Sequence, residues 1–335
     1  MKIDAYAHIV PPKLKDFIWK TKSTAIVEKL QRRIGPYISL YNLDERFRIM
    51  DKYPDRVEVL TLAWMAVHDI ADNTKEAVDL AQRINDAMAE LVFKYPDRFV
   101  AAAAVLPLKD MDAALKELDR AIKQLKLRGV LIRHPVDGKP LDAPDFMPLY
   151  EKMSYYDLPI FLHPVREIEF TDYPTLGKSK YDIFRTFGLP YETTATMSHL
   201  VFGGVLEKFP NLKFITHHCG GMVPYLAQRI LSHYNMTEQL QKLEFTKGLN
   251  SPVIEYFRRF YNDTAIAGNT PALMCAYHFF GADHLLFAHD MPFDAELGEY
   301  GIRKTIEGIE QMDIPDVDKK KIFGDNARKL MRLSV

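Results

Sequence analysis

Eight short and mostly apolar runs limit the folds open to this chain more than any other feature. They lie at residues 2–9, 57–62, 99–106, 129–132, 158–162, 212–215, 259–263 and 284–288. Runs of this kind are typical of strands in a parallel sheet that is buried on both faces. Parallel strands need long crossover connections, and stretches with helical periodicity separate the runs here. The sequence therefore predicts an α/β protein with a (β/α)8 TIM-like barrel.

The clearest predicted helix follows the second run and supports this alternation. Asn73 can cap its start, with Glu76 three residues later. Apolar residues then recur at helical spacing, as a stripe of Ala77, Leu80, Ala81, Ile84, Met88 and Leu91. An open doubly wound sheet is the alternative architecture. It is disfavoured because the first run carries Tyr6-Ala7-His8 at its carboxyl end and no glycine-rich phosphate loop follows it.

The chain has 335 residues, which fits one barrel domain with insertions, so we predict a single domain over residues 1–335. Two long segments lack a clear periodicity, near residues 22–43 and 164–191. We expect these segments to lie over one mouth of the barrel as irregular insertions and to shape the substrate site.

Charge and composition exclude several classes of partner. The formal net charge is −1, so nothing suggests a nucleic acid partner, and no apolar run approaches the roughly 20 residues that span a membrane. The two cysteines, Cys219 and Cys275, lie in different contexts, which favours a reducing compartment over a disulfide framework. With no signal-peptide pattern at the start, the expected location is cytoplasmic.

Four of the predicted strands end on histidine or aspartate. The first ends at His8, the fifth at His163, the sixth at His217-His218 and the eighth at His289-Asp290. In a barrel the carboxyl ends of all strands face one mouth, so His8, His163, either His217 or His218, and Asp290 can converge there. Neutral imidazoles with one carboxylate suit Zn²⁺ or another borderline divalent ion.

These residues belong to a set of motifs that runs through nearly the whole chain and resembles the amidohydrolase superfamily. The resemblance is to the branch that contains aminocarboxymuconate-semialdehyde decarboxylase and γ-resorcylate decarboxylase. It rests on Ile3-Asp4-Ala5-Tyr6-Ala7-His8, residues 85–99, Leu141-Asp142, Phe161-Leu162-His163-Pro164, residues 191–194, His218-Cys219-Gly220-Gly221, residues 261–264, residues 287–292 and residues 324–327.

The resemblance implies a role for each matching position. His8, His163 and Asp290 resemble metal ligands, and His218 resembles the catalytic histidine beside them, with Asp290 as a second group for proton transfer. His217 would then be a spare residue that points to the other face of its strand. The family usually has histidine or glutamate where this chain has Tyr6, whose phenol is a poor ligand because its ordinary pKa is near 10. Tyr6 is therefore predicted to contact the substrate or a metal-bound water.

Arg133, after the fourth strand, is a second predicted substrate contact. A guanidinium at the mouth can hold a carboxylate through two parallel hydrogen bonds, although pairing with a neighbouring acid would give it a purely structural role. Together these features predict a metal-dependent, non-oxidative decarboxylase (a carbon–carbon lyase) of a small aromatic or enoic carboxylic acid. The expected cofactor is a divalent metal, zinc first and manganese second.

Two other functions stay open at this stage. One is a metal-dependent hydrolase of a small amide, lactone or ester, with Asp290 as base. The other is a metal-free binding protein on the same barrel, which the exchange at Tyr6 would explain. For the enzyme, the expected partners are a small-molecule substrate and further copies of the chain in a homo-oligomer.

Overall fold

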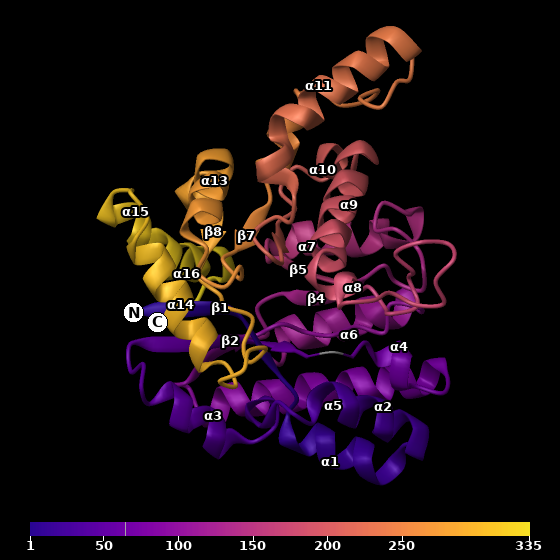
Figure 1. Cartoon of the computed structure of the whole chain (residues 1–335). Coiled ribbons are helices and arrows are strands. Elements are labelled where there is room, and N and C mark those ends of the chain that lie inside the picture. Colours follow the sequence, from indigo (N-terminus) through magenta and orange to yellow (C-terminus); the bar gives the residue numbers. More distant parts are fainter. Residues whose placement is uncertain (64) are drawn as a thin grey trace.

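The computed structural model describes residues 1–63 and 65–335, and its centre is a set of eight parallel strands (Figure 1). Their bounds are β1 Lys2–Ile9, β2 Arg56–Leu62, β3 Phe99–Ala102, β4 Val130–His134, β5 Ile160–Pro164, β6 Phe214–Thr216, β7 Tyr261–Asp263 and β8 Leu285–Leu286. Each strand falls on one of the eight predicted apolar runs. The strands shorten toward the C-terminus, where loops rather than longer strands carry the chain to the mouth.

The strands pair in two sheets, β1-β2-β3 and β4-β5-β6-β7-β8. A parallel bridge between Ala104 and Val130 joins the two sheets on one side. On the other side the amide of Ala5 in β1 donates to the carbonyl of Phe287, just after β8, at 2.8 Å. These contacts close the eight strands on themselves, and the predicted (β/α)8 barrel is confirmed.

Helices surround the strands (Figure 1). The α-helices are α1 Pro12–Thr21, α2 Thr24–Ile34, α3 Leu43–Met50, α4 Val67–Ile70, α5 Thr74–Lys94, α6 Met111–Lys123, α7 Met147–Tyr156, α8 Ile183–Thr186, α9 Gly188–Phe202, α10 Val205–Lys208, α11 Val223–Gln241, α12 Val253–Phe257, α13 Thr270–Phe280, α14 Glu299–Glu310, α15 Asp316–Lys320 and α16 Asn326–Met331. Short turns η1 Ile38–Leu40, η2 Pro144–Phe146, η3 Ala282–His284 and η4 Lys321–Asp325 complete the list.

The predicted helix after Asn73 is α5, and its capping is as expected. The side-chain oxygen of Asn73 accepts the amide of Glu76 at 3.0 Å. All six residues of the predicted stripe are buried. Burial of one apolar face against the strands stabilises the helix more than its intrinsic propensity does.

Both predicted insertions contribute to the mouth of the barrel, but the first is not irregular. It forms α2 and η1, because Leu30 and Ile34 give α2 an apolar face that the barrel buries. The second is irregular up to α8 and then enters α9 at Gly188. An ion pair between Arg33 and Glu167 joins the two segments.

One helix departs from the compact arrangement. α11 begins at the mouth and extends outward from the body of the molecule, while the two chain ends lie side by side (Figure 1). Within the described residues, no helix is long and apolar enough to cross a membrane.

Candidate active site

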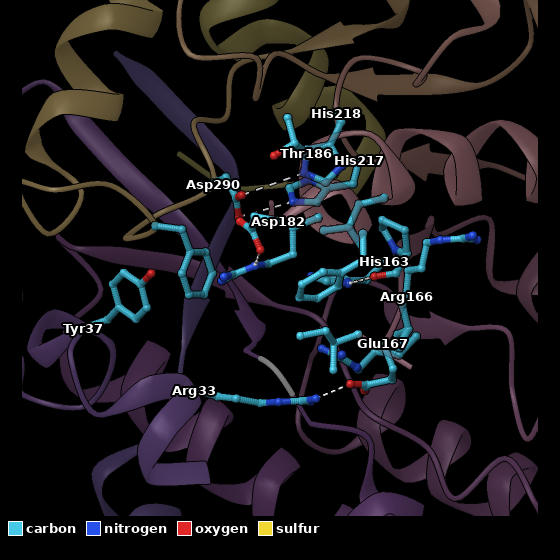
Figure 2. A pocket seen from close by; sticks show the side chains of 18 of the residues that line it. Arg33, Tyr37, His163, Arg166, Glu167, Asp182, Thr186, His217, His218 and Asp290 are labelled. Carbon is cyan, nitrogen blue, oxygen red and sulfur yellow. Dashed lines mark hydrogen bonds and ion pairs between the residues drawn. The ribbon is translucent and has the colours of Figure 1, made fainter. Parts of the chain in front are cut away.

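The mouth of the barrel holds a cavity of about 720 Å³, which is the size of a small-molecule site. His163, His217, His218 and Asp290 lie on one side of it, and Arg33 with Glu167 lies across from His217 and His218 (Figure 2). Each of these two pairs, His163 with Asp290 and His217 with His218, ends a strand or follows one at the carboxyl-terminal mouth of the barrel, as predicted. The carboxyl ends of β5, β6 and β8 thus bring together residues that are far apart in the sequence.

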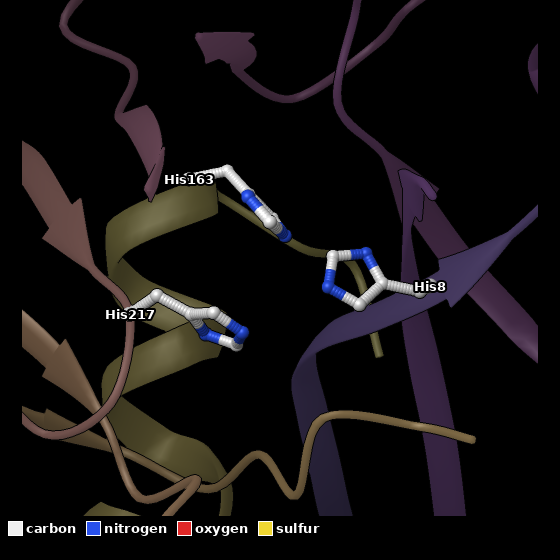
Figure 3. Close-up of side chains that lie close together, drawn as sticks. All are labelled: His8, His163 and His217. Atoms are coloured by element: carbon white, nitrogen blue, oxygen red, sulfur yellow. The ribbon is translucent and has the colours of Figure 1, made fainter. Parts of the chain in front are cut away.

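Three histidines form the base of this site: His8, His163 and His217. Their rings face one another, and their nearest ring nitrogens lie within 4.8 Å (Figure 3). Each Nδ1 has a fixed partner on the far side: the Thr61 hydroxyl for His8 (2.9 Å), the Pro164 carbonyl for His163 (2.8 Å) and the Asp263 carboxylate for His217. Such partners fix the ring orientation and leave Nε2 as the free ligand atom.

Asp290 closes the cluster from the loop after β8. Its Oδ1 lies 3.3 Å from Nε2 of both His8 and His217, and its Oδ2 lies 3.9 Å from Nε2 of His218. The residue has a φ of 64°, a left-handed conformation that turns the carboxylate toward the mouth. All four predicted metal and catalytic residues, His8, His163, His218 and Asp290, therefore share one site.

The prediction that His217 is a spare residue on the other face of its strand is wrong. Its ring centroid lies 5.3 Å from that of His163 and 4.1 Å from that of His218. Strand alternation does not apply beyond β6, which ends at Thr216, because His218 and Cys219, the two residues after His217, have left-handed φ values of 58° and 55°. The turn therefore presents both imidazoles to the same cavity.

Burial and neighbouring charges shift the pKa values of the cluster in opposite directions. Burial lowers the pKa of His8 and of His163, so both rings are neutral and able to act as ligands. Burial alone would also lower the pKa of His217, but the carboxylates of Asp263 and Asp290 raise it to about 10. Burial likewise opposes the charge on Asp290, yet His217 and His8 hold its pKa well below the usual range.

This set of donors fits a divalent cation. Nε2 of His8 is buried and makes no well-aligned hydrogen bond within the described part of the chain, although the carboxylate of Asp290 faces it. A divalent cation can bind a neutral imidazole nitrogen, a second imidazole and a carboxylate when the three lie this close together.

Tyr6 lies beneath this cluster and is not among the residues that line the cavity. Its ring is fully buried and stacks on His217, with the centroids 4.5 Å apart and the planes at 24°. Burial raises the pKa of the phenol well above its usual value, so the group is protonated in the metal-free site. The structure thus places Tyr6 against the histidines rather than against the bulk of the cavity.

Arg133 lines the cavity, as predicted. It stands beside His163 in register on the neighbouring strand β4. The side chain is buried, and no acid among the described residues lies within 4 Å of its guanidinium. The alternative in which Arg133 pairs with a neighbouring acid is therefore not what the structure shows.

Asp263 is a site residue that the sequence analysis did not single out. One of its carboxylate oxygens pairs with His217, and the other accepts the amides of Cys219 at 2.9 Å and Ala265 at 3.1 Å. It therefore fixes both the ring of His217 and the turn that follows β6. The signal was present, because Asp263 also ends a predicted strand.

The whole-chain comparison now decides the family. Residues 3–333 match the family described as amidohydrolase. This chain belongs to the amidohydrolase family. The (β/α)8 fold and the metal-capable cluster at the carboxyl ends of the strands agree with that membership.

Similar proteins place the chain within the family. It is 32% identical over 302 residues to γ-resorcylate decarboxylase of Polaromonas sp., with 87% of each chain covered. It is 28% identical to 2-amino-3-carboxymuconate-6-semialdehyde decarboxylase of Dictyostelium discoideum, with 99% of this chain and 92% of the relative covered. The crystal structure of a dihydroxybenzoic acid decarboxylase from Polaromonas sp., with bound manganese and the inhibitor 2-nitroresorcinol, superposes with a TM-score of 0.75 at 26% identity, covering 99% of this chain and 96% of that one.

These relatives confirm the predicted resemblance to the decarboxylase branch and the predicted class of enzyme, an amidohydrolase-related carboxy-lyase. They also support a divalent metal as the cofactor, since that solved relative holds manganese. The predicted preference for zinc over manganese stays a prediction.

Proposed function

We propose that this protein is a metal-dependent, non-oxidative decarboxylase of a small aromatic or enoic carboxylic acid. The observation that carries the proposal is the convergence of the His8, His163 and His217 nitrogens and the Asp290 carboxylate at the base of one cavity, beside His218. The decarboxylase relatives supply the reaction class.

His8, His163 and Asp290 would hold the metal, zinc or alternatively manganese. His217 would be a further ligand once a bound cation displaces the proton that Asp263 and Asp290 stabilise on its ring. The bound ion would supply positive charge that offsets the charge developing on the substrate oxygens. The electron pair of the broken carbon–carbon bond stays on the substrate, so no electrons pass to or from another molecule and no redox cofactor is needed.

His218 is suited to proton transfer. It lines the cavity next to Asp290, and burial together with neighbouring His217 lowers its pKa to about 4, so the ring is neutral at pH 7. A neutral His218 can take a proton from a substrate hydroxyl or from solvent. When the bond to the leaving carboxylate breaks, its electron pair stays on the ring or enoic carbon, and the protonated His218 delivers the proton to that carbon. Asp290 is the second group within reach of this proton.

The direct test is CO₂ release from purified, metal-loaded protein with panels of hydroxybenzoates and carboxymuconates, beside panels of lactones and amides. We expect CO₂ from at least one acid and no hydrolysis. Hydrolysis without CO₂ release would support the metal-dependent hydrolase. Protein that binds no divalent metal and releases no product would instead indicate a metal-free binding protein.

We also infer that the enzyme acts as a homo-oligomer in the cytoplasm. Large apolar side chains stay exposed along the outer helices, including Tyr191 on α9 and Tyr225 and Leu240 on α11. Tyr225 and Leu240 lie on the helix that extends outward from the body of the molecule (Figure 1), where a second copy of the chain could cover them.

A further inference from the structure

The position of Arg133 carries an inference about the substrate. Its side chain is only 7% exposed, and its Nε and Nη1 atoms are buried with no hydrogen-bond partner in the described part of the chain. A buried guanidinium without a counterion is costly to a fold, so its retention in a cavity wall points to an anion that arrives from outside.

The other arginines around the cavity differ from Arg133 in this respect. Each has an acid within 4 Å: Arg32 pairs with Glu28, Arg33 with Glu167, Arg166 with Glu192 and Arg185 with Asp182. Their charges are therefore compensated before any ligand enters. Within the described residues, Arg133 is the one cavity-lining arginine without an acid within 4 Å, and Asp69 and Glu167 act on its charge only from farther away.

The charge of the whole cavity agrees with this assignment. The acids just named offset four of the five arginines that line it, which leaves the positive charge of Arg133 and the negative charge of Asp290. A bound divalent metal would then give the cavity a net charge of +2. A monocarboxylate would neutralise only part of this charge, whereas a dianion matches it better.

Arg133 is also close enough to the histidine cluster for one small molecule to reach both. It pairs in register with His163 across adjacent parallel strands, which lie about 4.8 Å apart. Two acidic groups separated by a few bonds would span from the cluster to the guanidinium.

We propose that the substrate carries two anionic groups, and that Arg133 binds the group that stays while the carboxylate that leaves lies at the histidine cluster. This inference rests on the proposed function and names the substrate class for the same site: a small dicarboxylic acid or an acid with an equivalent second anion. Arg133 is then the residue that selects the dianion, through the planar fork that matches a carboxylate.

The test is calorimetric binding of two unreactive probes, isophthalate and benzoate, to metal-loaded protein. The parent should bind isophthalate at least about 10-fold more tightly than benzoate. Arg133→Gln should weaken isophthalate binding by about 10- to 100-fold, the size expected for a charge-assisted bidentate contact, and change benzoate binding less than 2-fold. Arg133→Lys should restore part of the loss, because it keeps the charge without the fork.

The matched control is Arg185→Gln, which removes a cavity arginine that Asp182 already compensates and should leave the preference unchanged. A second readout is thermal unfolding without ligand. Arg133→Met should raise the melting temperature, because it removes a buried charge with no partner, whereas an arginine with a structural role would lower it.

Equal weakening of both probes by Arg133→Gln would overturn the proposal, since Arg133 would then bind the single carboxylate at the cluster. An unchanged preference for isophthalate would also overturn it. The assay separates this inference from the proposed function. Dianion preference without CO₂ release from any acid would refute only the decarboxylase, and CO₂ release from monoacids without dianion preference would refute only the role of Arg133.

Discussion

The two histidines that follow β6 are adjacent in sequence, but their surroundings predict different roles. His217 sits in the buried cluster with His8 and His163, whereas His218 faces the cavity beside Asp290. We therefore expect His163→Ala and His217→Ala to lose bound metal as well as turnover. His218→Ala should keep the metal and lose turnover by about 100- to 10,000-fold, the usual contribution of a positioned acid–base group.

Metal content by elemental analysis, measured beside CO₂ release on the same samples, checks this prediction. Full metal content in His163→Ala would refute the ligand assignment. Loss of metal in His218→Ala would show that His218 is a ligand and not only a proton carrier. His199→Ala is a control, since that histidine pairs with Asp142 away from the cavity.

Tyr6 precedes the predicted ligand His8 by two residues on β1. Its hydroxyl is buried and has no hydrogen-bond partner among the described residues. If it orients a water bound to the metal, Tyr6→Phe should keep the metal but lower turnover, and Tyr6→His should tighten metal binding by adding an imidazole. Metal titration and steady-state rates of the two variants decide the matter, and a parent protein that binds no metal would contradict this reading.

At the scale of elements, a chain of buried charges joins β1, β2 and α3 beneath the site. Glu58 accepts from Arg46 at 2.7 Å and pairs with Arg56 at 2.8 Å, and all three side chains are fully buried. Arg46 also donates to the carbonyl of His8 at 2.8 Å, and Asp4 links Arg56 (3.1 Å) to His289 (2.8 Å) next to Asp290. These contacts hold the strand ends that carry the ligands.

Glu58→Gln would leave two arginines without their shared carboxylate in the core. We expect a loss of about 3–5 kcal/mol in the free energy of unfolding, because breaking a buried pair leaves an uncompensated charge. Urea unfolding of parent and variant measures it. The control is Glu45→Gln, which breaks an exposed pair with Arg48 and should cost less than about 1 kcal/mol. A similar cost for both variants would show that the buried network contributes no more than a surface pair.

At the scale of the whole molecule, a bound metal should link the two sheets of the barrel and stabilise the folded state. His8 belongs to β1, in the three-stranded sheet, whereas His163 and His217 belong to the five-stranded sheet or its edge. Chelation should therefore lower the melting temperature. Zinc or manganese at about 100 times its dissociation constant should restore about 2.7 kcal/mol of stability. The measurement is calorimetric unfolding with and without metal, and an unchanged melting temperature would indicate that no metal binds across the barrel.

The assembly state is a second prediction at this scale. One chain has a mass of 38.7 kDa, so sedimentation should show a species of at least twice that mass. Tyr225→Glu places a charge in the exposed apolar surface of α11 and should shift the population toward the single chain. A parent that sediments as a single chain at micromolar concentration would contradict the predicted homo-oligomer.

Much of this protein could be predicted from the amino-acid sequence, because the relevant signals are local. Apolar runs and helical periodicity indicated eight strands and a barrel, and the stripe and cap of α5 lie where the pattern placed them. The residues at the ends of the strands, His8, His163, His218 and Asp290, could be predicted to converge because every parallel strand in a barrel ends at the same mouth.

Only the tertiary structure decided what depends on the path of the chain beyond the strands. His217 and His218 face the same cavity because His218 and Cys219 have left-handed φ values, which strand alternation does not anticipate. Asp263 is a partner of His217, and Arg133 has no counterion, because of contacts between segments distant in sequence. Residues 22–43 contain a helix because the barrel buries one of its faces. A local pattern specifies which residues can form an element, but the partner of a buried charge is set by the packing of the whole chain.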